Sequence, residues 1–170
     1  MHLPKSPIPG LSEQALTHRE LWRISNHADL AGEGGLRADG RWHARGHRIV
    51  YLAASPPGAL IEHLAHLDMD ETELPSSYNL LRVGTPDEIE VEVLNAPDGD
   101  GWKRDFAVTR TIGDEWLRSG RTALAQVPSA IMPHTYNYLL NPDHNDVARF
   151  HIHEVIQALH DPRLLRRVRS

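Results

Sequence analysis

The feature that most constrains the fold is a short strand pattern followed at once by a helix start. Residues 47–53 form an apolar, β-branched and aromatic run, which is typical of a β-strand. Ser55 is a favoured helix N-cap, and Pro56 suits the first helical turn because its missing N–H group is not needed there. The sequence therefore predicts a strand carrying Tyr51, a turn, and a helix with Glu62 in the middle of its apolar pattern.

Glu62 has small neighbours on its own face of the predicted helix. The residues three and four positions away are Gly58, Ala59, Ala65 and His66. Small side chains leave open space beside a carboxylate, as a binding site requires. A solvent-exposed glutamate on a helix surface explains the same spacing, so the pattern leaves both interpretations open.

An arginine- and glycine-rich segment precedes this unit. Its arginines are Arg37, Arg41, Arg45 and Arg48, interleaved with glycines. Glycine lets the backbone approach a ligand closely, and guanidinium groups bind phosphate oxygens in pairs. The segment is a candidate phosphate site, although it lacks the glycine spacing of a Walker loop or a dinucleotide fingerprint, and a polar surface hairpin explains it equally well.

The other patterns predict many short strands and few helices, which indicates a single α+β domain over residues 1–170. Residues 20–24 form a strand pattern with Arg23 at its centre, and an arginine there needs a partner, a ligand or a solvent-facing strand surface. Residues 88–94 alternate strictly between apolar side chains and glutamates, as in a strand with one dry face. Further strands are expected at 78–83, 123–127 and 148–156, helices at 12–18, 114–119 and from 161 onward, and an acidic linker at 68–73.

Composition narrows the classes of function. The chain has 170 residues, enough for one domain with a sizeable core, and its 40% apolar and 24% charged content is ordinary for a globular protein. It has no cysteine, which excludes disulfides, zinc–thiolate sites and thiol catalysis. The net charge of −5 argues against a broad nucleic-acid surface. Without a signal-peptide pattern or a long apolar span, a cytoplasmic location is expected.

Five blocks in this order resemble the RES-domain family, the toxin half of many bacterial toxin–antitoxin pairs. They are LWRIS, GEGGLRADGRW, IVYLAASPPGALIE, VPSAI and NYLLNPDH, and together they span roughly residues 20–160. The family takes its name from an arginine, a glutamate and a serine. In this sequence these fall on Arg23 or Arg41, on Glu62 and on Ser129.

The resemblance implies a fold and a reaction. The fold would be similar to that of ADP-ribosyltransferase toxins, with two small packed β-sheets, flanking helices and a cleft for NAD⁺. The reaction would consume NAD⁺ as substrate by hydrolysis, by phosphorolysis or by transfer of ADP-ribose to a protein, without a metal. The partner would be an antitoxin with a helix-turn-helix part of the Xre type that blocks the cleft.

The resemblance also assigns roles to individual residues. Glu62, Tyr51 and Arg23 would be catalytic. NAD⁺ would be bound by Arg23, Arg41, Trp42, Tyr51 and Ser129. In this scheme the carboxylate stabilises positive charge on the ribose, the aromatic ring packs on the nicotinamide or ribose, and the arginines hold the pyrophosphate.

Two other classes of function compete with this one. His151 and His153 on one strand face, and Glu62, His63 and His66 on a helix, have spacings that occur in metal-dependent hydrolases, but a complete three-ligand motif is missing. The basic C-terminal segment RLLRRVRS, residues 163–170, is compatible with a non-enzymatic module that binds an acidic partner.

Overall fold

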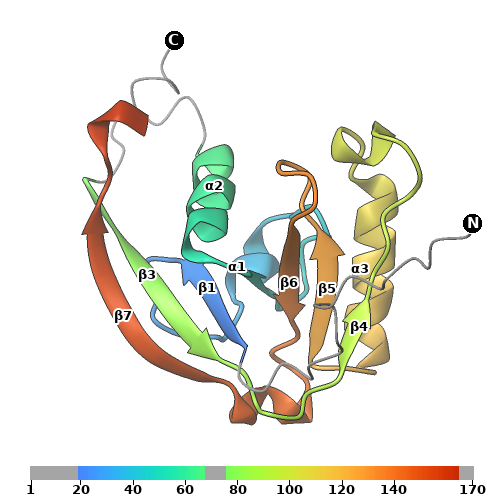
Figure 1. Cartoon of the computed structure of the whole chain (residues 1–170). Coiled ribbons are helices and arrows are strands. Elements are labelled where there is room, and N and C mark those ends of the chain that lie inside the picture. Colours follow the sequence, from blue (N-terminus) through green and yellow to red (C-terminus); the bar gives the residue numbers. More distant parts are fainter. Residues whose placement is uncertain (1–18, 68–75, 165–170) are drawn as a thin grey trace, which may run out of the picture.

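A computed structural model describes residues 19–67 and 76–164 of the chain. Within these residues, seven strands form one sheet in the order β4-β5-β6-β2-β1-β3-β7 (Figure 1). The strands are β1 (Glu20–Ile24), β2 (Val50–Ala53), β3 (Ser77–Gly84), β4 (Val91–Val93), β5 (Leu124–Pro128), β6 (Tyr136–Leu140) and β7 (His151–Leu159). The helices are α1 (Gly34–Arg37), α2 (Pro56–His66) and α3 (Ala107–Ser119), with 3₁₀ turns η1 (Gly101–Lys103) and η2 (Asn145–Arg149).

The sheet is continuous but divided into two halves. β2 and β1 are paired through one residue pair, Trp22 with Ala53, whereas the pairings on either side of this junction are longer. The halves therefore diverge in direction around the junction (Figure 1). The prediction of two separate packed sheets is wrong in this respect, because the Trp22–Ala53 pair joins all the strands into one mixed sheet in which only β4 and β5 are parallel.

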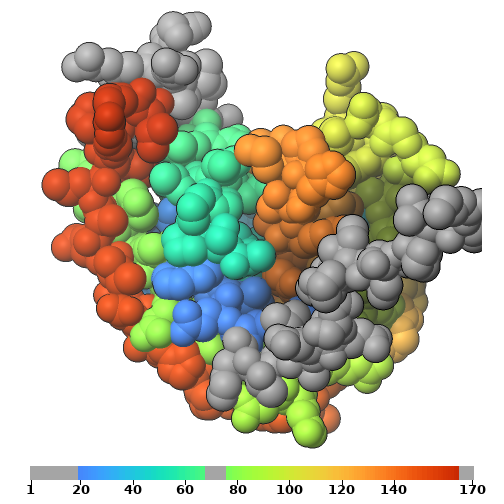
Figure 2. All heavy atoms as spheres, viewed as in Figure 1, coloured from blue at the N-terminus to red at the C-terminus, as the bar shows by residue number. Residues whose placement is uncertain are grey.

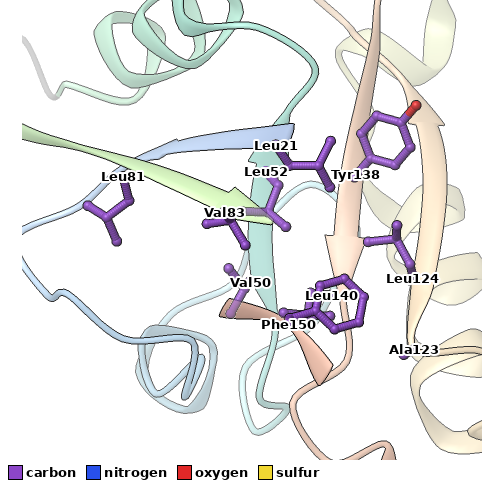
Figure 3. Close-up of a cluster of buried hydrophobic side chains, with 10 residues drawn as sticks. All are labelled: Leu21, Val50, Leu52, Leu81, Val83, Ala123, Leu124, Tyr138, Leu140 and Phe150. Carbon is purple, nitrogen blue, oxygen red and sulfur yellow. The ribbon is translucent and has the colours of Figure 1, made fainter. Parts of the chain in front are cut away.

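A first hydrophobic cluster fills the angle between the halves. Val83 of β3 lies beside Val50 and Leu52 of β2, and Leu81 belongs to the same cluster farther along β3 (Figure 3). The other buried members are Leu21, Ala123, Leu124, Tyr138, Leu140 and Phe150. Since side chains alternate along a strand, the same alternation that buries Val50 and Leu52 turns Tyr51 to the opposite face.

A second cluster packs α3 against that opposite face. Trp116 of α3 is fully buried, and the ring of Trp42 lies 6.3 Å from that of Trp102. A Cβ at Gly113 would lie 1.7 Å from the Trp42 carbonyl oxygen, so α3 can approach the chain this closely only with glycine at that position. This cluster anchors the backbone that leads into β2.

Most predicted elements are confirmed, with shifted ends. Ser55 caps α2 by accepting a hydrogen bond from the Gly58 N–H group, and Gly120 ends α3 in the left-handed region at φ 59°. The helix predicted at 114–119 begins earlier, at Ala107, and the strand predicted at 88–94 narrows to β4. The predictions at 12–18 and 68–73 lie outside the described residues, as does most of the predicted C-terminal helix.

Candidate functional site

A cavity of about 340 Å³ lies beneath α2, where β1, β2 and the glycine-rich loop around α1 converge. Its wall is formed by the middle of β1, by β2, by one face of α2 and by Asn137 of β6. The loop before β2 contributes Gly34, Gly35, Ala38, Asp39, Gly40, His43 and Ile49. The wall is mainly apolar and carries a few polar groups, which is the usual composition of a small-molecule site. Arg23, Tyr51 and Glu62, the three residues predicted to be catalytic, all line it.

Glu62 is held by one of its two carboxylate oxygens. Its Oε1 accepts hydrogen bonds from Ser129 Oγ at 3.0 Å and from Asn137 Nδ2 at 2.7 Å. Across the described part of the chain, Oε2 has no hydrogen-bond partner and is not a buried unsatisfied atom. The carboxylate is therefore fixed in orientation while its second oxygen remains available to a ligand.

Tyr51 offers its ring, because its hydroxyl group is fully engaged. His43 Nε2 contacts the Ala38 carbonyl oxygen at 3.0 Å, so Nε2 carries the proton and Nδ1 accepts one from the Tyr51 hydroxyl at 2.8 Å. The same hydroxyl oxygen accepts the Trp42 N–H group at 3.1 Å. Burial raises the pKa of the Tyr51 hydroxyl well above its usual range and lowers the pKa of His43, so both groups are neutral at pH 7.

Arg23 supplies the positive charge of the cavity. It is the only lysine or arginine among the described residues of the wall. Its guanidinium group donates to the Asp29 carbonyl oxygen at 3.0 Å, which leaves further N–H groups free to bind an anion. Burial lowers the pKa of Arg23, although an arginine keeps its charge at neutral pH. A half-buried cation to which no carboxylate of the described residues is hydrogen-bonded favours an anionic ligand.

The glycines of the predicted phosphate site approach the cavity, but its arginines do not. A Cβ at Gly35 would lie 2.2 Å from the His47 carbonyl oxygen, and one at Gly40 would lie 2.5 Å from the Tyr51 hydroxyl. Side chains would therefore push this loop away from β2. Arg37 and Arg45 are exposed, and neither lines the wall.

Arg41 and Trp42 lie behind the wall rather than on it. The Arg41 guanidinium donates to the Trp102 and Lys103 carbonyl oxygens at 3.2 and 3.1 Å and lies 4.2 Å from the centre of the Phe106 ring. Trp42 is only 2% exposed and belongs to the second hydrophobic cluster. Neither side chain lines the wall, and the expectation that both bind NAD⁺ stays a prediction.

Ser129 and Asn137 are the two residues that donate hydrogen bonds to Glu62. Ser129 is buried and lies outside the wall of the large cavity, where its hydroxyl also accepts the Ile131 and Met132 N–H groups at 3.2 Å. Asn137 was not singled out by sequence reasoning, although it belongs to the NYLLNPDH block. Its pairing with Ala53 in the sheet brings it to Glu62, a contact that no local pattern indicates.

Of the described residues behind the two competing classes, only Glu62, His63 and His66 reach the large cavity, where they line the wall. His151 and His153 lie on the exposed strand β7, and His153 packs where Gly84 has no side chain. The described residues contain no group of three or more histidine, aspartate or glutamate side chains placed to hold a metal ion. Arg163 of the basic C-terminal segment pairs with Asp161, and residues 165–170 lie outside the described part. Among the described helices, none is long and apolar enough to cross a membrane.

Comparison with known proteins identifies the family. Residues 20–164 match the model of the RES domain. The chain is 49% identical over 124 residues to "Toxin Res" of Pseudomonas putida, covering 73% of this chain and 85% of the relative. It is 36% identical over 157 residues to the "Prs ADP-ribosylating toxin" of a Sphingobium species, covering 86% and 96% of the two chains.

A solved structure has the same fold. It is the crystal structure of the MbcT–MbcA toxin–antitoxin complex of M. tuberculosis, which matches with a TM-score of 0.68 over 89% of each chain at 18% sequence identity. At this identity the likeness concerns the mixed α/β fold alone. The domain match and the two relatives show that the chain is a member of the RES-domain family of toxins.

Proposed function

We propose that this toxin consumes NAD⁺ by cleaving the bond between nicotinamide and ribose. The observation that carries the proposal is the arrangement of Glu62 at a cavity that Tyr51 and Arg23 also line. Its Oε1 is held by Ser129 and Asn137, and its Oε2 has no hydrogen-bond partner within residues 19–67 and 76–164. The cavity volume of about 340 Å³ lies within the range of small-molecule sites. The Sphingobium relative, named for ADP-ribosylation, supports the same substrate.

The chemistry follows from the charges on the wall. When the glycosidic bond breaks, its electron pair goes to the pyridine nitrogen, neutral nicotinamide leaves, and positive charge develops on the ribose. A carboxylate fixed by two donors needs no reorganisation to stabilise that charge. Glu62 Oε2 is the oxygen available for this role, either facing the charge directly or accepting a ribose hydroxyl.

Tyr51 and Arg23 position the two ends of the substrate in this scheme. The Tyr51 ring cannot turn away, because His43 and Trp42 hold its hydroxyl, so it presents a rigid surface against which the nicotinamide or ribose stacks. Arg23 binds the pyrophosphate through the N–H groups that Asp29 leaves free. Arg41 acts indirectly, by tying the loop before β2 to the segment at Trp102.

The fold is shared with a protein solved as a toxin–antitoxin complex. We extend this to the present chain and propose an antitoxin partner, of the helix-turn-helix type, that covers the mouth of the large cavity. Expression of the toxin alone is expected to arrest growth, and co-expression of the neighbouring small gene product to restore it.

Product analysis with the purified protein tests the reaction. Incubation with NAD⁺ labelled in the adenosine half is expected to release nicotinamide and to leave the label in free ADP-ribose, in a phosphorylated sugar or on a protein. The matched control is Glu62→Ala, which removes the carboxylate from the wall. Absence of nicotinamide release from folded wild-type protein, in buffer and in lysate, would refute the proposal.

A further inference from the structure

A second, smaller cavity adjoins the first and has no role in the scheme above. Its volume is about 180 Å³, and it shares Glu62 and Asn137 with the large cavity. Its other walls come from the first turn of α2 and from the segment that joins β5 to β6. The space-filling view shows these two elements side by side at the surface, α2 in teal and the connecting segment in orange (Figure 2). Pro57 and Met132, both exposed, lie on its wall, so the cavity opens to solvent.

The polar groups of this second cavity are hydroxyls and an amide. Ser55, Ser129, Thr135 and Asn137 provide them, and the carboxylate of Glu62 is the one charged group on the wall as described. No lysine, arginine or histidine is among those lining residues. An anion that entered would meet a carboxylate with no cation to offset the repulsion. The cavity therefore suits a neutral, hydroxyl-bearing molecule.

Where the two cavities meet, two acceptor oxygens receive no hydrogen bond from the described residues. Asn137 must direct Nδ2 to the Glu62 carboxylate, since only the N–H side of the amide can donate, and this fixes Oδ1 as an acceptor. Asn137 Oδ1 is buried and has no partner among the described residues. Glu62 Oε2 lacks a donor in the same part of the chain. A buried acceptor left unpaired is unfavourable unless a ligand supplies the O–H or N–H group.

We propose that the second cavity is the acceptor site of the reaction and that it admits a hydroxyl nucleophile. The inference rests on the proposed function, which places the ribose in the large cavity beside Glu62. The C–N bond to nicotinamide breaks with its electron pair on the pyridine nitrogen, and the hydroxyl oxygen forms the new bond to the ribose carbon. The hydroxyl proton passes to Glu62 Oε2 and then to solvent. Water and the side chain of a serine-type residue share this chemistry, whereas inorganic phosphate does not fit.

Competition between two small nucleophiles tests the chemical class. The wild-type protein is incubated with NAD⁺ and either methanol or inorganic phosphate, and the products are separated chromatographically. Methanol is expected to give methyl ADP-ribose in proportion to its concentration, and phosphate to give no phosphorylated sugar. A phosphorylated sugar as the main product would overturn the inference while leaving NAD⁺ cleavage intact.

A filling variant tests the location. Thr135→Met extends a side chain into the second cavity, and the backbone contact of Thr135 with Ser129 is retained because it uses main-chain atoms. Nicotinamide release and methanol transfer are expected to fall at least about tenfold, since a nucleophile displaced by an ångström reacts poorly, while affinity for NAD⁺ stays unchanged. Ile131→Met, which introduces the same side chain at an exposed residue outside both cavities, should retain wild-type rates.

The outcomes separate this inference from the proposed function. Unchanged turnover in folded Thr135→Met would overturn the acceptor site alone. Failure of the wild type to bind or cleave NAD⁺ would overturn the proposed function and with it the acceptor site. If Thr135→Met does not fold, the choice between methanol and phosphate by the wild type still decides the chemical class. The source of the hydroxyl then follows from lysate: label on a protein indicates a side chain, and free ADP-ribose indicates water.

Discussion

Replacing Glu62 by glutamine removes one negative charge and almost no volume. The amide oxygen of glutamine can still accept from Ser129 and Asn137, and its nitrogen then occupies the position of Oε2. Hydrogen bonds to a neutral acceptor are weaker than those to a carboxylate, by about 1 kcal/mol each at most, and the relief of burying a charge offsets part of this loss. The free energy of unfolding should therefore change by no more than about 1 kcal/mol.

The effect on catalysis should be larger. A full positive charge about 4 Å from a carboxylate is stabilised by about 4 kcal/mol at an effective dielectric constant of about 20. Because Glu62 is only half-buried and the transition state carries less than a full charge, about 3 kcal/mol is a reasonable expectation, which corresponds to a fall of about 100-fold in rate. Affinity for NAD⁺ should change less than the rate, because the positive charge lies on the pyridinium ring in the ground state and moves onto the ribose only as the bond breaks.

The assay is nicotinamide release under single-turnover conditions, with NAD⁺ binding measured by calorimetry and folding by thermal unfolding. Glu33→Gln is a matched control, because Glu33 is an exposed glutamate whose contact is Arg37 at 4.0 Å. Near-wild-type turnover in a folded Glu62→Gln protein would refute the assignment of Glu62. A variant that loses activity together with its thermal transition would instead show a structural role.

Four further outcomes are expected. Ser129→Ala should lower turnover about tenfold, because Glu62 loses one of its two donors. Ser129→Thr keeps the hydroxyl and should therefore turn over NAD⁺ faster than Ser129→Ala. Arg23→Gln should weaken NAD⁺ binding about 10- to 100-fold with a smaller effect on the maximal rate, measured as a split between KM and kcat; an effect on kcat alone would contradict a pyrophosphate contact. Tyr51→Phe keeps the ring and should retain activity within about threefold. Its free energy of unfolding, measured by thermal unfolding, should fall by about 1–2 kcal/mol because two hydrogen bonds are lost. Burial lowers the pKa of His43 in the folded protein. Its contribution to stability is therefore complete above the unfolded pKa of about 6.5 and is lost as the pH falls below that value. Between pH 7 and 5 the melting temperature should fall less in His43→Gln than in the wild type.

Local sequence patterns predicted helix ends and strand faces correctly where a few neighbouring residues determine them. Ser55 and Pro56 set the start of α2, Gly120 sets the end of α3, and alternation over residues 50–53 sets the faces of β2. The start of α3 was missed because Gly113 breaks its helical pattern, and the reason for that glycine is the Trp42 backbone, which is distant in sequence.

The sequence by itself was enough to select the three side chains at the centre of the proposed site, because each belongs to a short block similar to a known family. Arg23, Tyr51 and Glu62 are brought to one cavity as those blocks implied. The same blocks could not separate a wall residue from a packing residue. Arg41 and Trp42 do not line the cavity, because both pack against residues 102–116, which are far along the chain.

Only the tertiary structure decided how Glu62 is held and what lies on each side of it. Its two donors, Ser129 and Asn137, are 67 and 75 residues away in the chain. They reach Glu62 because β6 pairs with β2 and because the turn after β5 folds over α2. A contact of this kind depends on strand register and on the direction of a loop, which are set by the packing of the whole sheet and leave no periodic signal in the sequence.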